Sequence, residues 1–248
     1  MLARLYTTNY RCLVNFEFKP STKQLIIGRN GTGKTTVLDV LAMLRDFAGL
    51  GLPCEGQLGG KTRTRWQDVP EQRFELDVKG NGGEYRYTLL VGEHGSPLRP
   101  IVEQETLDFN SKPLFRSGNG IIELFSDERG PAPKFQFPSD IHRSGLTIIG
   151  DHWKQTELTW FKSWLHGLVE IQINPWAMSA RSGGESRYPN KDLSNFADWY
   201  RHLRLESGSA IFEAMTSLRE AIPGLEALDA KEAGLDVRVL QAATRSPN

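Results

Sequence analysis

The amino-acid sequence predicts an α/β fold: a P-loop-type mixed sheet with an antiparallel β-subdomain, followed by a C-terminal helical lobe. Three observations carry this prediction. A glycine-rich turn lies between a short apolar segment and an amphipathic segment. Two runs of alternating apolar and polar residues follow, and from about residue 151 apolar residues recur at helical spacing. We therefore expect a nucleotide-binding region with a hairpin subdomain at 1–125, a linker at 126–150, and a helical lobe with a final short strand at 151–248.

The first elements surround the glycine-rich turn. Short strands are expected over 2–6 and 13–18, from apolar positions at Leu2, Leu5, Leu13, Phe16 and Phe18. The segment "KQLIIG" at 23–28 is expected to form a short buried strand that ends in glycine. Apolar residues at helical spacing then predict a helix over 35–47, and Gly49 follows it as a stop signal.

The middle of the chain has the period of strands. Residues 49–70 are rich in glycine, proline and polar residues and are expected to form a loop. In "RFELDVKGNGGEYRYTLLV" apolar residues alternate on both sides of "GNGG", which is the signature of a β-hairpin. Further strands are expected at 100–108 and near 112–116, and the proline-containing segment 126–145 reads as another loop.

The last third of the chain has the period of helices. One apolar stripe is formed by Trp153, Leu158, Trp160, Phe161, Trp164, Leu165 and Leu168. The segments "DLSNFADWYRHL" and "SAIFEAMTSLREAIPG" predict two more helices, the second ending at Pro223-Gly224. Near the end, "LDVRVLQ" at 235–241 predicts a strand.

Composition narrows the class of protein. Lys plus Arg and Asp plus Glu are equal at 30 each, so net charge gives no argument about nucleic acid. The two cysteines, Cys12 and Cys54, make neither a disulfide framework nor a structural zinc site. The sequence shows no apolar signal region and no apolar window long enough to cross a membrane. We therefore expect a cytoplasmic protein without a membrane span.

The glycine-rich turn predicts a phosphate-binding site. "GRNGTGKT" matches G-x-x-x-x-G-K-[ST] at every fixed position, with the required strand before it and helix after it. The glycines let successive backbone N–H groups point at a phosphate, and the helix N-terminus adds its partial positive charge. We expect ATP, or alternatively GTP, with Mg²⁺. The expected nucleotide-binding residues are Gly28, Arg29, Asn30, Gly31, Thr32, Gly33, Lys34, Thr35 and Thr36.

Three side chains of this site have distinct expected roles. Lys34 would bridge the β- and γ-phosphates and is the candidate catalytic residue. The hydroxyl of Thr35 would be a ligand of Mg²⁺, and Thr36 would lie near the α-phosphate.

The order of motifs resembles a known group of ATPases. A short strand, "NYR", "FEF" and "IIGRNGTGKTTVLDVLAML" resemble the start of the RecF/SMC/OLD-type proteins, ABC-like AAA ATPases of DNA repair, recombination and phage defence. The resemblance is specific over residues 1 to about 47 and weaker to about 125. It implies that Arg11 contacts the nucleotide, and it makes DNA a candidate partner.

The second half of the family's site does not follow. Such proteins continue with a signature motif and a Walker B strand ending in Asp-Glu, which orients the attacking water. Asp127-Glu128 follows an apolar run that Glu123 and Ser126 interrupt, and no Glu follows Asp151. "ARSGGES" at 180–186 looks like a signature only superficially, because no Asp-Glu strand follows it. Gln104 could be the family's γ-phosphate-sensing glutamine or a plain strand residue.

The sequence thus resembles the N-terminal part of such an ATPase without the Walker B and signature half. We expect an incomplete ATPase half that binds ATP and needs a second copy or a companion chain to hydrolyse it. Two alternatives remain open: a P-loop kinase-like transferase, and a non-catalytic nucleotide-sensing DNA-binding module. The basic run "KTRTRW" at 61–66 could touch a phosphate backbone or be a solvated loop.

Overall fold

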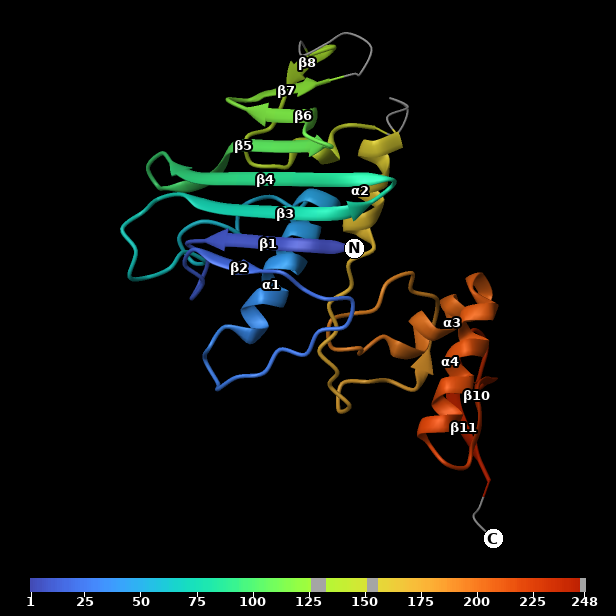
Figure 1. The fold of residues 1–248 in the computed structure, drawn as a ribbon. Coiled ribbons are helices and arrows are strands. Elements are labelled where there is room, and N and C mark those ends of the chain that lie inside the picture. Colours follow the sequence, from blue (N-terminus) through green and yellow to red (C-terminus); the bar gives the residue numbers. More distant parts are fainter. Residues whose placement is uncertain (126–132, 151–155, 246–248) are drawn as a thin grey trace. The chain divides into compact units, whose positions relative to one another are not determined.

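The computed structural model describes residues 1–125, 133–150 and 156–245. It divides into two compact units, Met1–Leu168 and Val169–Asn248, and each is described by itself below (Figure 1). The sequence places the linker at 126–150, whereas the structure divides the chain at Leu168 and Val169. The expected features at Asp127-Glu128, Asp151 and Trp153 lie outside the described residues.

The first unit is built on an eight-stranded sheet with the order β2-β1-β3-β4-β5-β6-β7-β8. Its strands are β1 (Leu2–Thr8), β2 (Phe16–Phe18), β3 (Gln72–Gly80), β4 (Gly83–His94), β5 (Arg99–Phe109), β6 (Lys112–Gly118), β7 (Ile121–Leu124) and β8 (Phe135–Pro138). The predicted hairpin is confirmed. Gly80 pairs with Gly83, and Asn81 and Gly82 between them have φ angles of 50° and 76°, as a tight two-residue turn requires.

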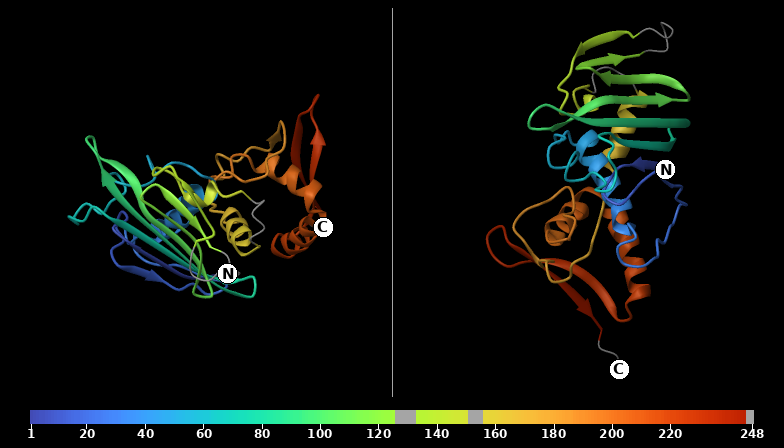
Figure 2. Two further views of the ribbon diagram at one scale, coloured as in Figure 1. Left: turned by 90° about the horizontal axis from the view of Figure 1, so that it is seen from above. Right: turned by 90° about the vertical axis from the view of Figure 1, so that its left-hand side faces the viewer.

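Helices cover one face of this sheet. Alternation buries Phe74, Leu76 and Val78 of β3 on the inner face. Figure 2 shows α1 (Lys34–Leu44), continued by a π-helical turn at Arg45–Gly49, and α2 (Thr156–His166) on this same face. The predicted apolar stripe of α2 is confirmed from residue 156 onward, and it explains why α2 belongs to the first unit. Its Phe161 is fully buried, and Trp160 stacks on Tyr85 with ring centroids 5.0 Å apart.

A buried carboxylate on the inner face of the sheet forms hydrogen bonds with the later loop at Ser144 and Gly145. Glu105 of β5 is fully buried, and its Oε1 accepts hydrogen bonds from the hydroxyls of Tyr87, at 2.8 Å, and Ser144, at 2.5 Å. Its Oε2 accepts one from the backbone N–H of Gly145, at 2.8 Å. These donors favour the ionised carboxylate, but burial outweighs them and raises the pKa of Glu105 to about 6.

The second unit combines helices with a small sheet. It contains β9 (Arg181–Ser182), α3 (Phe196–Glu206), α4 (Gly208–Ala221), β10 (Leu225–Glu232) and β11 (Arg238–Thr244), with strand order β10-β11-β9. The two predicted helices are confirmed, and the predicted final strand lies at 238–244. Sequence reasoning missed β9 and β10. Tyr200 is among the few buried side chains, and its hydroxyl donates to the carbonyl of Leu228 at 2.7 Å.

Two expectations about the first unit are wrong. The sheet is antiparallel at every described pairing rather than mixed. "KQLIIG" at 23–28 is not a strand, and its Leu25 and Ile27 are 79% and 81% exposed. Strands persist only where a neighbour takes up their backbone hydrogen bonds. Among the described residues, the N–H groups of Leu25, Ile26 and Ile27 donate to none.

Two further boundaries differ from the expected ones. The strand expected over 13–18 is reduced to Phe16–Phe18, because Asn15 inside it has a positive φ angle of 47° and bends the chain. Strands β7 and β8 were also missed, and β8 lies inside the segment expected to be a loop. The chain is therefore α/β in content, with a large antiparallel sheet in its first unit.

Candidate phosphate-binding site

The glycine-rich turn leads directly into α1. Gly31 and Gly33 have φ angles of 81° and 91°, a left-handed conformation that side chains other than glycine's rarely adopt. Gly33 is also enclosed: a Cβ there would lie 3.0 Å from the Cys12 Sγ and 3.3 Å from the Leu13 Cδ2. A Cβ at Gly31 would meet nothing within 4 Å. The motif glycines thus set the backbone path, and Gly33 also allows the chain after β1 to pack against the turn.

The lysine of the motif folds back over its own turn. The Lys34 Nζ donates to the carbonyl oxygens of Gly28, at 2.8 Å, and Arg29, at 2.7 Å. The Thr32 hydroxyl also donates to the Arg29 carbonyl, at 2.9 Å. The ammonium group is therefore held at the mouth of the turn by neutral acceptors. An anionic phosphate oxygen would form a stronger, charge-assisted hydrogen bond with it.

Thr35, the residue expected to bind Mg²⁺, has a hydroxyl that is open to such an ion. Thr35 lies in the first turn of α1, is exposed, and its hydroxyl makes no hydrogen bond to another described residue. Mg²⁺ commonly takes one or two protein oxygens and completes its shell with phosphate and water. Across the described ranges, no group of three or more His, Cys, Asp or Glu could hold a metal ion. Thr35 together with the phosphates of a nucleotide stays the expected donor set.

The turn after β1 brings Arg11 to the same helix. The backbone of Tyr10 and Leu13 closes this turn, with hydrogen bonds of 3.2 and 2.8 Å. The Arg11 guanidinium forms an ion pair with the Asp39 carboxylate on α1. Next to it, the Cys12 Sγ lies 3.7 Å from the Thr36 Oγ1. Arg11 therefore lies beside the helix of the motif, and its contact with a nucleotide, which the resemblance implies, stays a prediction.

The basic run at 61–66 joins this turn. The Arg11 backbone N–H donates to the Thr62 carbonyl at 2.6 Å. The buried Asn9 side chain accepts from the Thr64 N–H at 3.0 Å and donates to the Val69 carbonyl at 2.7 Å. Sequence reasoning missed Asn9 and Asp39. An asparagine directly after an apolar strand was a weak signal for Asn9, but no spacing rule connects Arg11 with Asp39.

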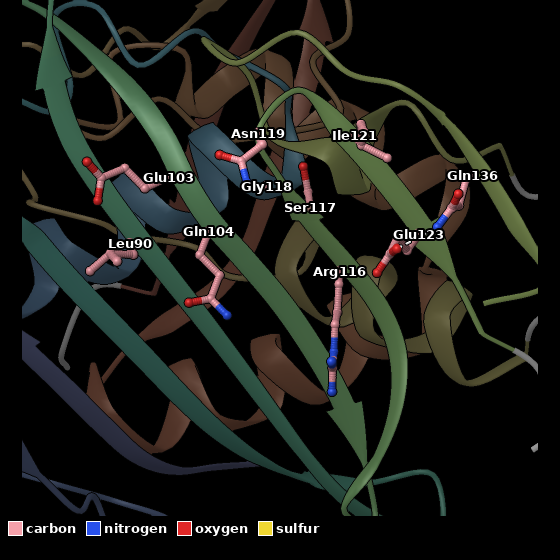
Figure 3. A pocket seen from close by; sticks show the side chains of 10 residues that line it. All are labelled: Leu90, Glu103, Gln104, Arg116, Ser117, Gly118, Asn119, Ile121, Glu123 and Gln136. Carbon is pink, nitrogen blue, oxygen red and sulfur yellow. Dashed lines mark hydrogen bonds between the residues drawn. The ribbon is translucent and has the colours of Figure 1, made fainter. Parts of the chain in front are cut away.

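Two other sequence candidates lie elsewhere. Gln104 is exposed on the outward face of the sheet, opposite the buried Glu105, whereas α1 packs on the inner face. Figure 3 shows it in a polar hollow with Glu103, Arg116, Glu123 and Gln136. "ARSGGES" belongs to the second unit, where the Gly184 N–H donates to the Asp198 carboxylate at 3.3 Å. The described chain has no helix long and apolar enough to cross a membrane.

Comparison with known proteins adds one finding. A family model described as "AAA domain, putative AbiEii toxin, Type IV TA system" matches residues 25–159, which is more than half of the 248 residues. A search of curated proteins gave no match. The matched segment contains the glycine-rich turn, α1 and strands β3 to β8.

Proposed function

The chain belongs to the AAA domain family described as a putative AbiEii toxin of a type IV toxin–antitoxin system, and on this premise we propose that it binds ATP with Mg²⁺ and hydrolyses it only with a partner. Membership of this family makes it a P-loop ATPase-like protein. The observation that carries the proposal is the Lys34 ammonium, held over the glycine turn by the carbonyls of Gly28 and Arg29. Phage defence is the setting that fits the family description; DNA repair or recombination follows only from the RecF/SMC/OLD resemblance.

Different residues of the first unit would bind different parts of Mg-ATP. The N–H groups of the turn and the N-terminus of α1 would receive the phosphates. Lys34 would exchange its two carbonyl acceptors for phosphate oxygens, and Thr35 would be a ligand of Mg²⁺. Arg11 is already fixed on α1 by Asp39, so it would add a positive charge on the Thr36 side of the site. Mg²⁺, when bound, would neutralise charge that develops on the phosphates.

Hydrolysis needs groups beyond these. A catalytic carboxylate orients the attacking water in P-loop ATPases. The site as described contains the cations and the turn, while Asp39 is engaged with Arg11. We propose that a second copy or a companion chain supplies the Walker B and signature groups. The exposed apolar side chains of Leu25 and Ile27 support this, because the backbone N–H groups of this segment donate to no described residue and could pair with another strand.

Phosphate release at several protein concentrations tests this proposal. With Mg-ATP in excess, release per chain should rise with concentration if a second copy completes the site, and Lys34→Ala should abolish it. Lys23→Ala, an exposed lysine on the same segment but outside the motif, is the matched control. Fast release that does not depend on concentration would contradict the need for a partner. Binding without release at every concentration would exclude a second copy as that partner.

A further inference from the structure

A positively charged hollow lies within the second unit. It is formed between α3 and the hairpin of β10 and β11, and its volume is about 530 Å³. Four basic residues and one acidic residue, Asp229, are among those that line it; the basic residues are Arg201, Arg204, Lys231 and Arg238. None of these residues belongs to the phosphate-binding turn or to the first unit.

The fold brings these cations together from three elements. Arg201 and Arg204 are three residues apart on α3, so they lie on one face of that helix. Lys231 lies on β10, on the same side of the hairpin as Asp229, which is two residues earlier. Arg238 lies on β11 and pairs with Glu232, so it lines the hollow from the end of the hairpin rather than from the face of Lys231. The elements are labelled in Figure 1. Because the cations are up to 37 residues apart in sequence (238 minus 201), no local motif predicts the hollow.

The existing ion pairs leave this charge weakly compensated. Arg204 lies 3.8 Å from Asp229, Arg201 lies 3.8 Å from Glu185, and Arg238 lies 3.9 Å from Glu232. All three distances exceed that of a hydrogen bond, and pairs this loose and solvated contribute little. The Lys231 ammonium has no ion pair or side-chain hydrogen bond to the residues that the structure describes.

We infer that this hollow binds phosphate groups, from a nucleic-acid backbone or from a free polyphosphate. Guanidinium groups match phosphate oxygens in two-pronged hydrogen bonds, and Lys231 adds a point charge. The hollow is larger than one phosphate group needs, so the ligand carries at least two. Leu205 is the large apolar residue of the lining, and no described lining residue is aromatic. Bases therefore find no stacking surface, and binding is independent of base sequence.

The test is salt-dependent binding of a labelled oligonucleotide to the full chain. Fluorescence anisotropy of a fluorescein-labelled single-stranded oligonucleotide gives the affinity at several salt concentrations. The double variant Arg204→Ala/Lys231→Ala should weaken binding about tenfold or more and reduce the slope of log K against log salt by about one to two. Arg204→Lys/Lys231→Arg, which keeps both charges, should retain most of the affinity.

A matched control variant distinguishes the effect of changing the hollow from the effect of removing positive charge elsewhere on the second unit. Arg187→Ala/Arg245→Ala removes the same number of charges from the second unit, at exposed positions outside the hollow. It should leave the affinity within about twofold of the wild type. An equal loss in the control would overturn the proposal. The variant Lys34→Ala should bind the oligonucleotide with the affinity of the wild type. Oligonucleotide binding therefore tests the hollow, whereas Mg-ATP binding tests the phosphate-binding turn.

A second titration distinguishes the two sources of phosphate. Calorimetry with inorganic tripolyphosphate is carried out in the Lys34→Ala background, which removes the other phosphate site. If the wild type binds the oligonucleotide and Arg204→Ala/Lys231→Ala does not, the ligand of the hollow is a nucleic-acid backbone. Tripolyphosphate binding lost in that variant, without oligonucleotide binding, assigns a free polyphosphate. Binding of polyglutamate but of neither phosphate probe would overturn the proposal in favour of an acidic protein segment.

Discussion

The guanidinium of Arg11 forms an ion pair with the carboxylate of Asp39, which fixes the turn after β1 to the helix of the glycine-rich motif. The backbone N–H of the same Arg11 donates to the carbonyl of Thr62 at 2.6 Å. Three segments far apart in sequence thus meet beside the first turns of α1. This arrangement gives Arg11 two separable roles, holding the turn in place and presenting charge to a nucleotide.

Substitution of Arg11 should weaken nucleotide binding more than it weakens the fold. Arg11 has 47% of its side chain exposed, and surface ion pairs of this kind contribute about 0–1 kcal/mol to stability. Arg11→Ala should therefore change the free energy of unfolding by about 1 kcal/mol at most, and weaken Mg-ATP binding about tenfold. Asp39→Asn breaks the same pair but keeps the cation. Equal losses of affinity in the two variants would show that Arg11 acts only by holding the turn.

Gly33→Ala should be more damaging than Gly31→Ala. Both glycines have positive φ, so alanine costs about 1 kcal/mol or more at either position. Only at Gly33 would the added Cβ also meet the Cys12 Sγ, at 3.0 Å. Urea unfolding should give Gly33→Ala the lower midpoint at an unchanged slope. Equal midpoints would mean that the contact between Cys12 and the turn does not constrain the native state.

Acidification should stabilise the protein through Glu105. Burial raises the pKa of this carboxyl from 4.5 to about 6, so the folded state binds the proton more tightly than the unfolded state. The free energy of unfolding should then rise as pH falls from 7 through 6 towards 4.5, by about 2 kcal/mol from this group. The difference in the free energy of unfolding between the wild type and Glu105→Gln, measured across this pH range, isolates the contribution of Glu105. A difference that stays constant with pH would show that the carboxyl is not titrating in this range.

Phe161→Ala should show that α2 is part of the first unit's core. Phe161 is fully buried, and its ring lies 5.7 Å from that of Tyr87 on β4. Loss of a buried Phe side chain costs about 3–5 kcal/mol, measured by urea unfolding. Ser163→Ala, on the exposed side of the same helix, should change stability by about 0.5 kcal/mol or less. Similar small effects in both variants would mean that α2 does not stabilise the sheet.

The spacing of apolar residues along the chain predicted the helices and strands whose formation depends on that spacing alone. The hairpin around "GNGG", the helix after Lys34 and the buried stripe through Phe161 all follow from spacing along the chain. The segment 23–28 has the pattern of a strand but not the conformation, because a strand also needs a neighbour. The motif likewise predicted the glycine-rich turn before α1, and the role of Lys34 stays a prediction. The motif could not predict the ion pair of Asp39 with Arg11, or that Lys231 and Arg204 line one hollow, because both depend on tertiary packing.

Calorimetric titration of Mg-ATP into the wild-type chain and into Lys34→Ala tests the central claim most directly. The ammonium of Lys34 lies 2.8 Å from the Gly28 carbonyl, at the mouth of the turn, so it should be the main charge that a phosphate meets. The account predicts saturable one-to-one binding by the wild type, a dependence on Mg²⁺, and loss of binding in Lys34→Ala while Lys23→Ala binds normally. Equal binding by the wild type and Lys34→Ala, or binding by neither, would contradict a nucleotide site at this turn.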